Sequence, residues 1–305
     1  MNNYIVSLTT IPSKFDNLYI TIDSLVCQTV IPCKIVINIP RKYNFRMNNS
    51  EIPSDKLNDF IDKYSKFNVC INLLDKDYGP GTKLLGLLNS SIINNLDISN
   101  TYIILVDDDV VYKHFMIEHF EKCIISNNAE VASFFVYDFN KVKIGQGVDG
   151  FLIKLSTLNH FLLYYNLIKE LDYINYHDDF YISYFFHLIN KSIEYIRLDQ
   201  CVIYYKHSNT FIDCLNDIQG KYSRENLQHN LFNILDDLNK NGDFDHLKQL
   251  NLYNSIEYHL SSIEYYNEKS NDEIFEIFSK NDKLCDILNS VNKRDFIEYL
   301  KQMDK

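Results

Sequence analysis

The stretch "YIILVDDDVVY", residues 102–112, places three consecutive aspartates directly behind an uninterrupted apolar run. The run "YIILV" is rich in β-branched and apolar residues, which predicts a strand that is covered on both faces, as in a parallel sheet. Adjacent carboxylates repel one another, and the next basic residue is Lys113. Asp107, Asp108 and Asp109 are therefore costly at this position unless a cation lies among them.

The chain around this stretch alternates between strand-like and helix-like patterns at a pace typical of an α/β fold. Short apolar runs predict strands over residues 4–8, 34–40, 68–74, 102–106, 130–137 and 150–156. Apolar residues at helical spacing predict helices over residues 17–28, 54–66, 82–92 and 178–191. We expect a mixed, mostly parallel sheet flanked by helices. Ligands bind such sheets at the carboxyl ends of the strands, which is where the three aspartates fall.

The hydrophobic pattern of the sequence changes after about residue 215. Strand-like runs stop, and apolar residues recur every three or four positions over 227–240, 246–266, 272–280, 282–291 and 294–303. We therefore expect an α/β domain over residues 1–215 and an all-helical C-terminal appendage over 216–305. The amphipathic helices of the appendage offer a surface for a homo-oligomer.

Composition excludes several classes of protein. The formal net charge of -11 argues against a nucleic-acid partner, because such proteins normally present a basic face. No run approaches the roughly 18 uncharged apolar residues of a transmembrane helix, and the first residues do not form a secretory signal. The seven cysteines are odd in number and form no CxxC pair, which favours buried free thiols in a reducing compartment. The chain is rich in Asn, Ile and Lys, a bias that an AT-rich genome produces. We expect a cytoplasmic protein, or a host-cytoplasmic or virion-associated one if that genome belongs to a large DNA virus.

The aspartate cluster is the first candidate for chemistry. Carboxylate oxygens suit hard divalent ions such as Mg²⁺, Mn²⁺ and Ca²⁺. In an extended segment Asp107 and Asp109 point to one side and Asp108 to the other, so the first and third can share one ion. The alternative is a solvated turn in which an aspartate caps the following helix. For three aspartates behind a buried strand we favour the metal site.

Two threonines and a lysine follow the first predicted strand, in "SLTTIPSKF" (7–15). Thr9 and Thr10 fall at the carboxyl end of the strand, where they can meet a ligand, and Lys14 is near. A strand end followed by an ordinary turn is the simpler alternative.

Two glycine-containing segments are further candidates. "DYGPGTKLLG" (77–86) opens a helix, and a helix N-terminus with Lys83 nearby suits a phosphate, although the GxxxxGK[ST] spacing of a P-loop is absent. "GQGVDGFLIK" (145–154) contains Gly150 at the start of a predicted strand, where a ligand can approach the backbone. For the first segment we favour a structural turn, whereas for the second an ordinary β-turn and a ligand contact are equally compatible with the sequence.

Two later segments contain ionisable candidates. "YHDDFYISYFF" (176–186) carries Asp178 and Asp179 at the start of a helix, where the helix dipole alone would favour acids, but where either could also serve as a general base. "YYKHSNTF" (204–211) places His207 at the end of the α/β part, as a distal ligand if a metal binds.

Together these segments carry a resemblance. "VSLTTIPSKF", "SLVCQTVIPCKIVINIP", "DYGPGTKLLG" and "YIILVDDDVVY", in this order, resemble nucleotide-sugar-dependent glycosyltransferases of the Rossmann-like GT-A fold, in particular small bacterial and giant-virus enzymes that open with a "TTIPSR"-type strand end. The resemblance covers roughly residues 4–210 and is most specific in the first 112. It does not extend to the helical C-terminal third.

The resemblance implies a metal site. In that family a DxD motif at a strand end holds Mn²⁺ or Mg²⁺, which bridges the diphosphate of the nucleotide sugar. Carried onto this chain, Asp109 is the main metal ligand, Asp107 reaches the metal or the ribose, and Asp108 can replace either. A late histidine completes the metal shell in many members, and His207 occupies that place.

The resemblance also implies the donor and catalytic residues. Thr9 and Thr10 line the nucleotide base pocket, and Lys83 faces the nucleotide. The base is expected at Asp179, with Asp178 as its rival. The full set that we assign to the nucleotide sugar is Thr9, Thr10, Lys14, Lys83, Asp107, Asp108 and Gly150.

The expected function is metal-dependent transfer of a sugar, of the hexosyltransferase type, from a nucleoside-diphosphate sugar to a hydroxyl acceptor. UDP-sugar is the expected donor, and the acceptor is a glycan, a protein or a lipid-linked hydroxyl. Direct displacement with Asp179 as the base would invert the anomeric configuration. One alternative is a nucleotidyltransferase acting on a sugar phosphate, which shares the acids and the metal but attacks phosphorus. Another is a non-catalytic scaffold that retains the fold and uses its helical tail for interaction.

Overall fold

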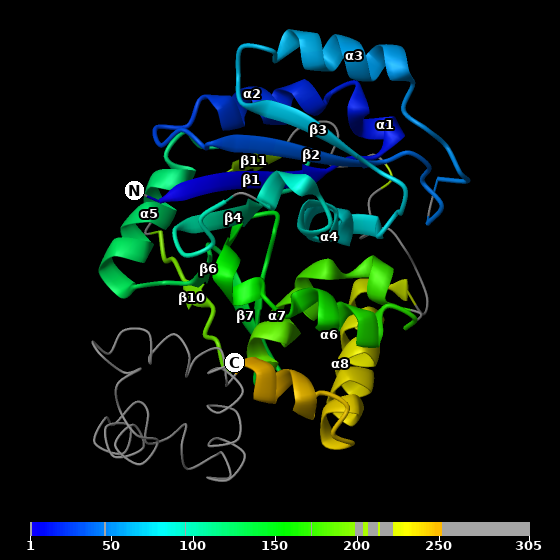
Figure 1. The fold of residues 1–305 in the computed structure, drawn as a ribbon, viewed down its shortest axis with the longest axis vertical. Coiled ribbons are helices and arrows are strands. Elements are labelled where there is room, and N and C mark those ends of the chain that lie inside the picture. The colour runs from blue at the N-terminus through cyan, green and yellow to red at the C-terminus, as the bar shows by residue number, and fades with distance from the viewer. Residues whose placement is uncertain are drawn as a thin grey trace, which may run out of the picture. The chain divides into compact units, whose positions relative to one another are not determined.

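The computed structural model describes residues 2–45, 47–94, 96–171, 173–198, 204–206, 213 and 222–251. Its centre is a seven-stranded sheet in the order β10-β6-β9-β4-β1-β2-β3 (Figure 1). The strands of this sheet are β1 (Asn3–Thr9), β2 (Lys34–Pro40), β3 (Val69–Leu74), β4 (Thr101–Leu105), β6 (Val131–Ser133), β9 (Phe151–Lys154) and β10 (Glu194–Tyr195). Two short antiparallel pairs lie beside it, formed by β5 (Val110–Tyr112) with β11 (Tyr204–Lys206) and by β7 (Val136–Phe139) with β8 (Val142–Gly145).

The sheet is mixed and mostly parallel. Strands β3, β2, β1 and β4 are parallel neighbours, and only β9 runs antiparallel, between β4 and β6. The predicted α/β class is confirmed. Because four parallel strands end at the same edge of the sheet, the segments that follow β1, β3 and β4 come together there.

The prediction of a single strand over residues 130–137 is wrong, because the structure has two strands there. Residues 130–137 form β6 and β7, which belong to different sheets. The Ser133 hydroxyl donates to the carbonyl of Gly150 and lies within hydrogen-bond distance of the backbone of Phe135 and Gln146. Such side chain to backbone bonds compete with the sheet ladder, and they end β6 at this residue.

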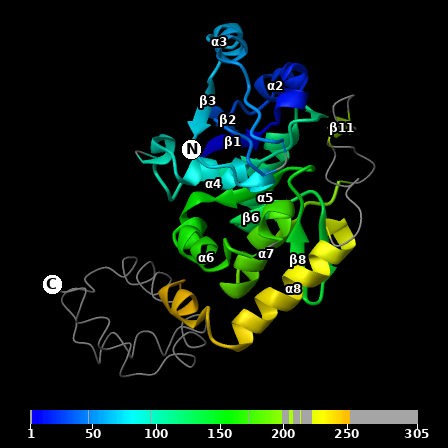
Figure 2. The ribbon, with the colours of Figure 1, turned by 90° about the vertical axis from the view of Figure 1, so that its right-hand side faces the viewer.

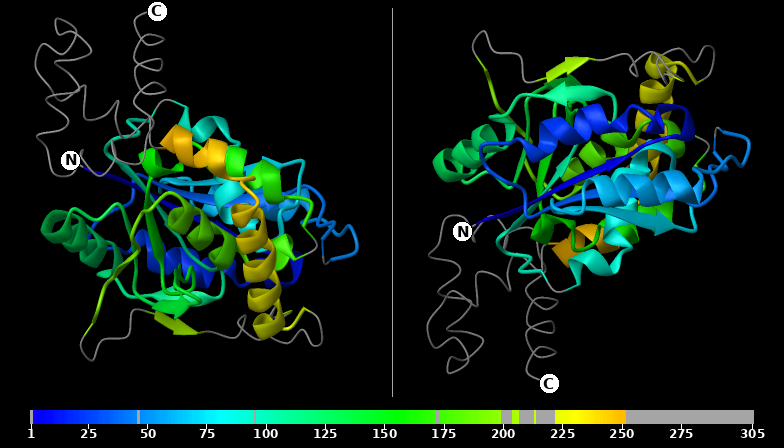
Figure 3. Two further views of the ribbon diagram at one scale, coloured as in Figure 1. Left: turned by 90° about the horizontal axis from the view of Figure 1, so that it is seen from below. Right: turned by 90° about the horizontal axis from the view of Figure 1, so that it is seen from above.

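Helices cover both faces of the sheet (Figure 3). One face packs against α1 (Pro12–Phe15), α2 (Leu18–Val26), α3 (Ser54–Lys63) and α5 (Met116–Asn127) in one hydrophobic cluster. The opposite face carries α4 (Thr82–Leu88), α6 (Phe161–Ile168) and α7 (Asp178–Leu188). Phe186 of α7 meets Phe151 of β9 with the ring centroids 6.2 Å apart.

The side chains of β1 divide between these two layers. Tyr4, Val6 and Leu8 belong to the hydrophobic cluster, whereas Ser7 turns to the other face and donates a hydrogen bond to the carbonyl of Lys83 in α4. All of these side chains are buried. A strand covered on both faces needs apolar residues in nearly every position, which explains the continuous run in the sequence.

The chain forms two compact units, Met1–Asp243 and Phe244–Lys305. Helix α8 (Arg224–Lys240), the first helix of the predicted appendage, belongs to the first unit and packs beside α7 and the β7–β8 hairpin (Figure 2). The ring of Phe139 in β7 lies 5.1 Å from that of His229 and 5.9 Å from that of Phe232. The predicted helix over 246–266 is helical as far as residue 251, where the described residues end, and the predicted helices over 272–280, 282–291 and 294–303 lie outside them.

The cysteine prediction is wrong in part. Cys123 is buried as expected and Cys70 is half-buried, but Cys27 and Cys33 are exposed because they lie in the connection from α2 to β2, which runs over the surface. Among the helices of the described ranges, none carries the apolar length that a membrane span requires.

Candidate active site

A cavity of about 360 Å³ lies at the carboxyl ends of the parallel strands. Its walls come from the segments after β1, β3 and β4, from β11, and from the first residues of α7 and α8. Its volume is within the roughly 300–1,000 Å³ that is typical of small-molecule sites. Acidic residues outnumber basic ones in its lining, which contains Asp77, Asp107, Asp108, Asp109, Asp178, Asp179, Asp213, Lys14, Lys83, Lys206 and Arg224.

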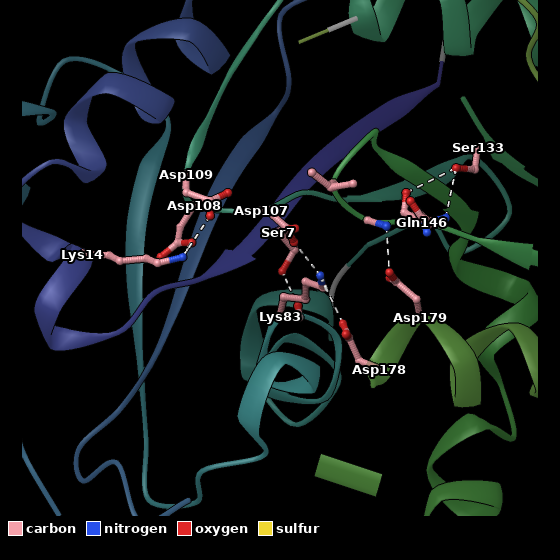
Figure 4. A network of polar contacts seen from close by, with 12 residues as sticks. Ser7, Lys14, Lys83, Asp107, Asp108, Asp109, Ser133, Gln146, Asp178 and Asp179 are labelled. Atoms are coloured by element: carbon pink, nitrogen blue, oxygen red, sulfur yellow. Dashed lines mark hydrogen bonds and ion pairs between the residues drawn. The ribbon is translucent and has the colours of Figure 1, made fainter. Parts of the chain in front are cut away.

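Two lysines from distant parts of the chain contact the aspartate cluster (Figure 4). The Lys14 Nζ atom lies 2.9 Å from Asp109 Oδ2 and 3.7 Å from Asp108 Oδ1. The Lys83 Nζ atom lies 2.8 Å from Asp107 Oδ1. The chain bends at Asp108 and Asp109, so the strict alternation expected of an extended segment does not continue beyond β4. Asp108 and Asp109 therefore approach the same amino group.

Burial and these ion pairs perturb the cluster. Burial alone would raise the pKa of Asp107, but the attraction and hydrogen bond of Lys83, together with the charges of Lys14 and Arg224, hold that pKa below its ordinary value. Burial raises the pKa of Asp108 to about 6, against the attraction of Lys14 and with the repulsion of Asp109. The acids likewise raise the pKa of Lys14 despite the burial of its amino group. The lysines stay cationic, and the cluster retains a surplus of acid.

A ladder of polar side chains, two of them buried and one half-buried, positions Lys83. Ser7 in β1 donates to the Lys83 carbonyl at 2.5 Å, and Asn38 in β2 donates to the Ser7 hydroxyl at 2.9 Å. Asn72 in β3 donates to the Asn38 side-chain oxygen at 2.9 Å and to the Gly86 carbonyl at 3.0 Å. Satisfied buried networks are rigid. This one ties the first and last turns of α4 to three strands.

Gly86 permits the close approach of α4 to the sheet, and we expect Gly86→Ala to destabilise the protein. An added Cβ would lie 2.5 Å from Leu74 Cδ1 and 3.0 Å from Asn38 Cβ. Overpacking of this kind costs about 1–3 kcal/mol, whereas the same change in an open helix stabilises by up to about 1 kcal/mol. The midpoint of urea unfolding measures the difference. A stabilised variant would contradict the tight packing.

The two acids at the start of α7 have different surroundings. Asp178 is buried, and its Oδ2 atom lies 3.1 Å from Lys83 Nζ, as an ion pair that lacks the alignment of a hydrogen bond. Asp179 Oδ1 accepts a hydrogen bond from the backbone N–H of Gly147 at 3.0 Å. Burial, followed by the repulsion of Asp178, raises the pKa of Asp179 to about 7, against the attraction of Lys83. A carboxyl group with this pKa can take and release protons near neutrality.

The structure brings most of the predicted residues into this one cavity. Its lining contains Thr9, Thr10, Lys14, Lys83, Asp107, Asp108, Asp109, Asp178 and Asp179. Gly150 is not part of the lining: its backbone φ is +94°, and an added Cβ would meet Phe120 and Met116 of α5. Gly150 is therefore structural: it allows the left-handed backbone and the close packing against α5 just before β9. His207 lies outside the described residues.

Sequence reasoning missed several groups in the lining. Arg224 begins α8, and its charge favours the ionised form of Asp107. His177 is buried and kept neutral, since burial lowers its pKa to about 3, and its Nε2 atom lies 3.0 Å from Gln228 Nε2 of α8. Asp77 accepts hydrogen bonds from the N–H groups of Phe45 and Gly79. The turn at Asp77 could have been predicted from the glycines and proline that follow it. The packing of α8 against the cavity could not, because nothing in the local sequence indicates it.

The donor set can be tested against a divalent ion. Among the residues that the structure describes, no three His, Cys, Asp or Glu side chains converge as a complete metal cage. Mg²⁺ and similar ions are commonly held by one or two carboxylates together with substrate phosphates and water. Asp107 and Asp109 provide hard oxygen ligands in a cavity with surplus acid, so the residues fit an ion that binds together with an anionic substrate.

Comparisons with known proteins give the following matches. No family model and no curated protein matches the sequence. Among solved structures, residues 1–349 of S. aureus TarS are 16% identical with a TM-score of 0.45, covering 68% of this chain and 61% of that one. The complex of that fragment with UDP-GlcNAc is 15% identical with a TM-score of 0.43, covering 67% of this chain and 58% of that one. A third match is the mannosyltransferase PcManGT from Pyrobaculum calidifontis in complex with GDP-Man and Mn²⁺. It is 12% identical with a TM-score of 0.37, covering 52% of this chain and 46% of that one. The chain therefore spans about three fifths of the TarS fragment that it matches.

Proposed function

We propose that this protein is a glycosyltransferase that moves a sugar from a nucleoside-diphosphate sugar, with UDP-sugar as the expected donor, to a hydroxyl acceptor. The observation that carries the proposal is the arrangement of the cavity. An acidic cluster and buried lysines lie on one side, and an acid with a pKa of about 7, Asp179, lies on the other. The sequence resemblance supports the same reaction.

The reaction needs a proton acceptor and stabilisation of the leaving group. The acceptor oxygen attacks the anomeric carbon and its proton passes to the Asp179 carboxylate, while the bond from the anomeric carbon to the phosphate oxygen breaks. The departing nucleoside diphosphate keeps the bonding electron pair. Lys14, Lys83 and Arg224 line the cavity and supply positive charge to that anion.

We further propose that Asp107 and Asp109 hold Mn²⁺ or Mg²⁺ together with the donor. The bound ion would act as a Lewis acid on the diphosphate. An anion entering a cavity with surplus acid is repelled unless positive charge enters with it. The lysine ammonium groups neutralise part of the cluster, and a divalent ion would supply the remaining positive charge.

The ionisation of Asp179 predicts a pH profile. A carboxyl group with a raised pKa is protonated below that value and cannot accept a proton, so kcat/KM should rise about tenfold per pH unit below about 7 and level off above it. Initial rates at constant ionic strength, with kcat/KM fitted to one ionisation, measure the limb. A flat profile across neutrality would contradict a titrating base in the free enzyme.

Product analysis tests the proposed function. The protein is incubated with Mn²⁺ and, in turn, UDP-GlcNAc, UDP-glucose and GDP-mannose, with water or simple sugars as acceptors. Release of a nucleoside diphosphate supports glycosyl transfer. Release of pyrophosphate from a nucleoside triphosphate and a sugar phosphate would instead identify a nucleotidyltransferase. If no nucleotide raises the melting temperature, the protein is a scaffold, because a ligand that binds the native state stabilises it.

A further inference from the structure

The amino group of Lys83 joins the two sides of the cavity. Only 4% of the residue is exposed, and its Nζ atom lies 2.8 Å from Asp107 Oδ1 and 3.1 Å from Asp178 Oδ2. Figure 4 shows this side chain between the segment after β4 and the start of α7. The three acids near it raise its pKa well above the ordinary value despite the burial, so it is cationic.

The contacts of Lys83 distinguish the two neighbouring acids of α7. Asp178 is engaged by the ammonium group, whereas the neighbouring carboxylate of Asp179 is held by the Gly147 amide. An added Cβ on Gly147 would lie 2.7 Å from Lys83 Nζ and 3.2 Å from Asp179 Oδ1. The ammonium group and the Asp179 carboxylate therefore lie on the same side of Gly147, close to one another.

We propose that Lys83 is a positioning residue for the general base: it holds Asp178 in an ion pair, leaves Asp179 to take the acceptor's proton, and links that base to Asp107 on the donor side. The proposal rests on the glycosyl transfer proposed above. It assigns Lys83 a second role beyond contact with the nucleotide. Through this link, a ligand that draws Asp107 away from Lys83 leaves more of the ammonium's charge to the acids of α7.

The groups around Asp179 determine the direction of each test. Asp178 on its own helix and Asp107 after β4 repel its ionised form, and Lys83 on α4 attracts it. Tyr137 of β7 also interacts with Asp179, and Arg224 of α8 contacts Tyr137. Removing the charge of Lys83 should therefore raise the pKa of Asp179, and removing that of Asp178 should lower it.

The experiment compares Lys83→Met, Asp178→Asn and the double variant. In the ligand-free protein, carboxyl ¹³C NMR follows the Asp179 signal, which is assigned by its loss in Asp179→Asn. We expect the Asp179 midpoint to move up by roughly one pH unit in Lys83→Met and down by roughly one in Asp178→Asn. The acid limb of kcat/KM should move in the same directions. The double variant removes one charge of each sign near Asp179, so the two shifts should largely cancel and Asp179 should titrate near the wild-type midpoint.

Each outcome decides the proposal. An unmoved Asp179 midpoint in Asp178→Asn, or a shift to higher pH, would overturn it even if Lys83→Met does not fold. A change only in the KM for the donor in Lys83→Arg and Lys83→Met, with an unchanged limb, would leave Lys83 as a simple nucleotide contact. The NMR titration needs no substrate. If the Asp179 midpoint moves in opposite directions in Lys83→Met and Asp178→Asn but no sugar is transferred, the proposed function is refuted. The electrostatic link between Lys83 and the acids of α7 is then still supported.

Discussion

Replacing Asp179 with asparagine should lower kcat by about 10²–10⁴-fold, the usual contribution of a positioned general base. The variant keeps the shape of the side chain and its acceptance of the Gly147 N–H, so the fold around it is preserved. It loses only the ability to take the acceptor's proton. The affinity for UDP in the presence of Mn²⁺ should stay within about threefold of wild type, because the uncharged side chain repels the diphosphate less than a carboxylate does.

Two controls make this prediction specific. Asp138→Asn makes the same chemical change at an exposed residue of β7, outside the cavity, and should leave kcat unchanged. Asp178→Asn removes the acid that is paired with Lys83 and should reduce kcat much less than Asp179→Asn does. If Asp178→Asn instead abolishes transfer while Asp179→Asn retains it, the base is Asp178. Loss of UDP binding in Asp179→Asn would mean that the residue serves the donor.

Much of the fold was predictable because parallel strands have strong local signals. The runs that became β1, β2 and β4 are mostly apolar, as burial on both faces requires, and the edge strand β3 is mostly apolar although it is only partly buried. The division of residues 130–137 into β6 and β7 was not predictable, since it depends on backbone partners of Ser133 that lie more than ten residues away.

The place of the site followed from topology, whereas its internal contacts did not. Strand ends in a parallel sheet meet at one edge, so the aspartates, the threonines after β1 and Lys83 could be expected together. The partners of the acids could not, because Lys14 is 95 residues from Asp109 and Lys83 is 24 residues from Asp107. The sequence showed an acidic cluster that needs a cation, and the fold supplies two ammonium groups for part of that need. Which acid of α7 is engaged by Lys83 likewise depends on how α4 is seated by Ser7 and Asn38.

Asp109→Asn should remove the metal-dependent part of donor binding. Loss of partners that merely support a metal ligand typically costs about 10–100-fold in metal affinity, and loss of a ligand itself should cost at least as much. We expect Mn²⁺ to strengthen UDP binding by wild type and to have little effect on the variant. Isothermal titration of UDP, with Mn²⁺ and with EDTA in its place, measures the two affinities. Asp138→Asn serves again as the matched control and should keep the full effect of Mn²⁺.

The measurement without metal separates this role from simple charge repulsion. Asp109 is paired with Lys14 at 2.9 Å, and its loss leaves that ammonium group with Asp108, 3.7 Å away. The variant cavity carries one negative charge fewer, so UDP should bind it as well as or better than wild type when EDTA is present. If Asp109 only repels anions, the variant binds UDP more tightly in both conditions. If Asp109 is a metal ligand, the variant binds more weakly with Mn²⁺ and not without it. Tighter UDP binding by Asp109→Asn in both conditions would contradict the metal assignment. Loss of a metal ligand should weaken UDP binding when Mn²⁺ is present, whereas loss of a repelling charge should strengthen it in both conditions.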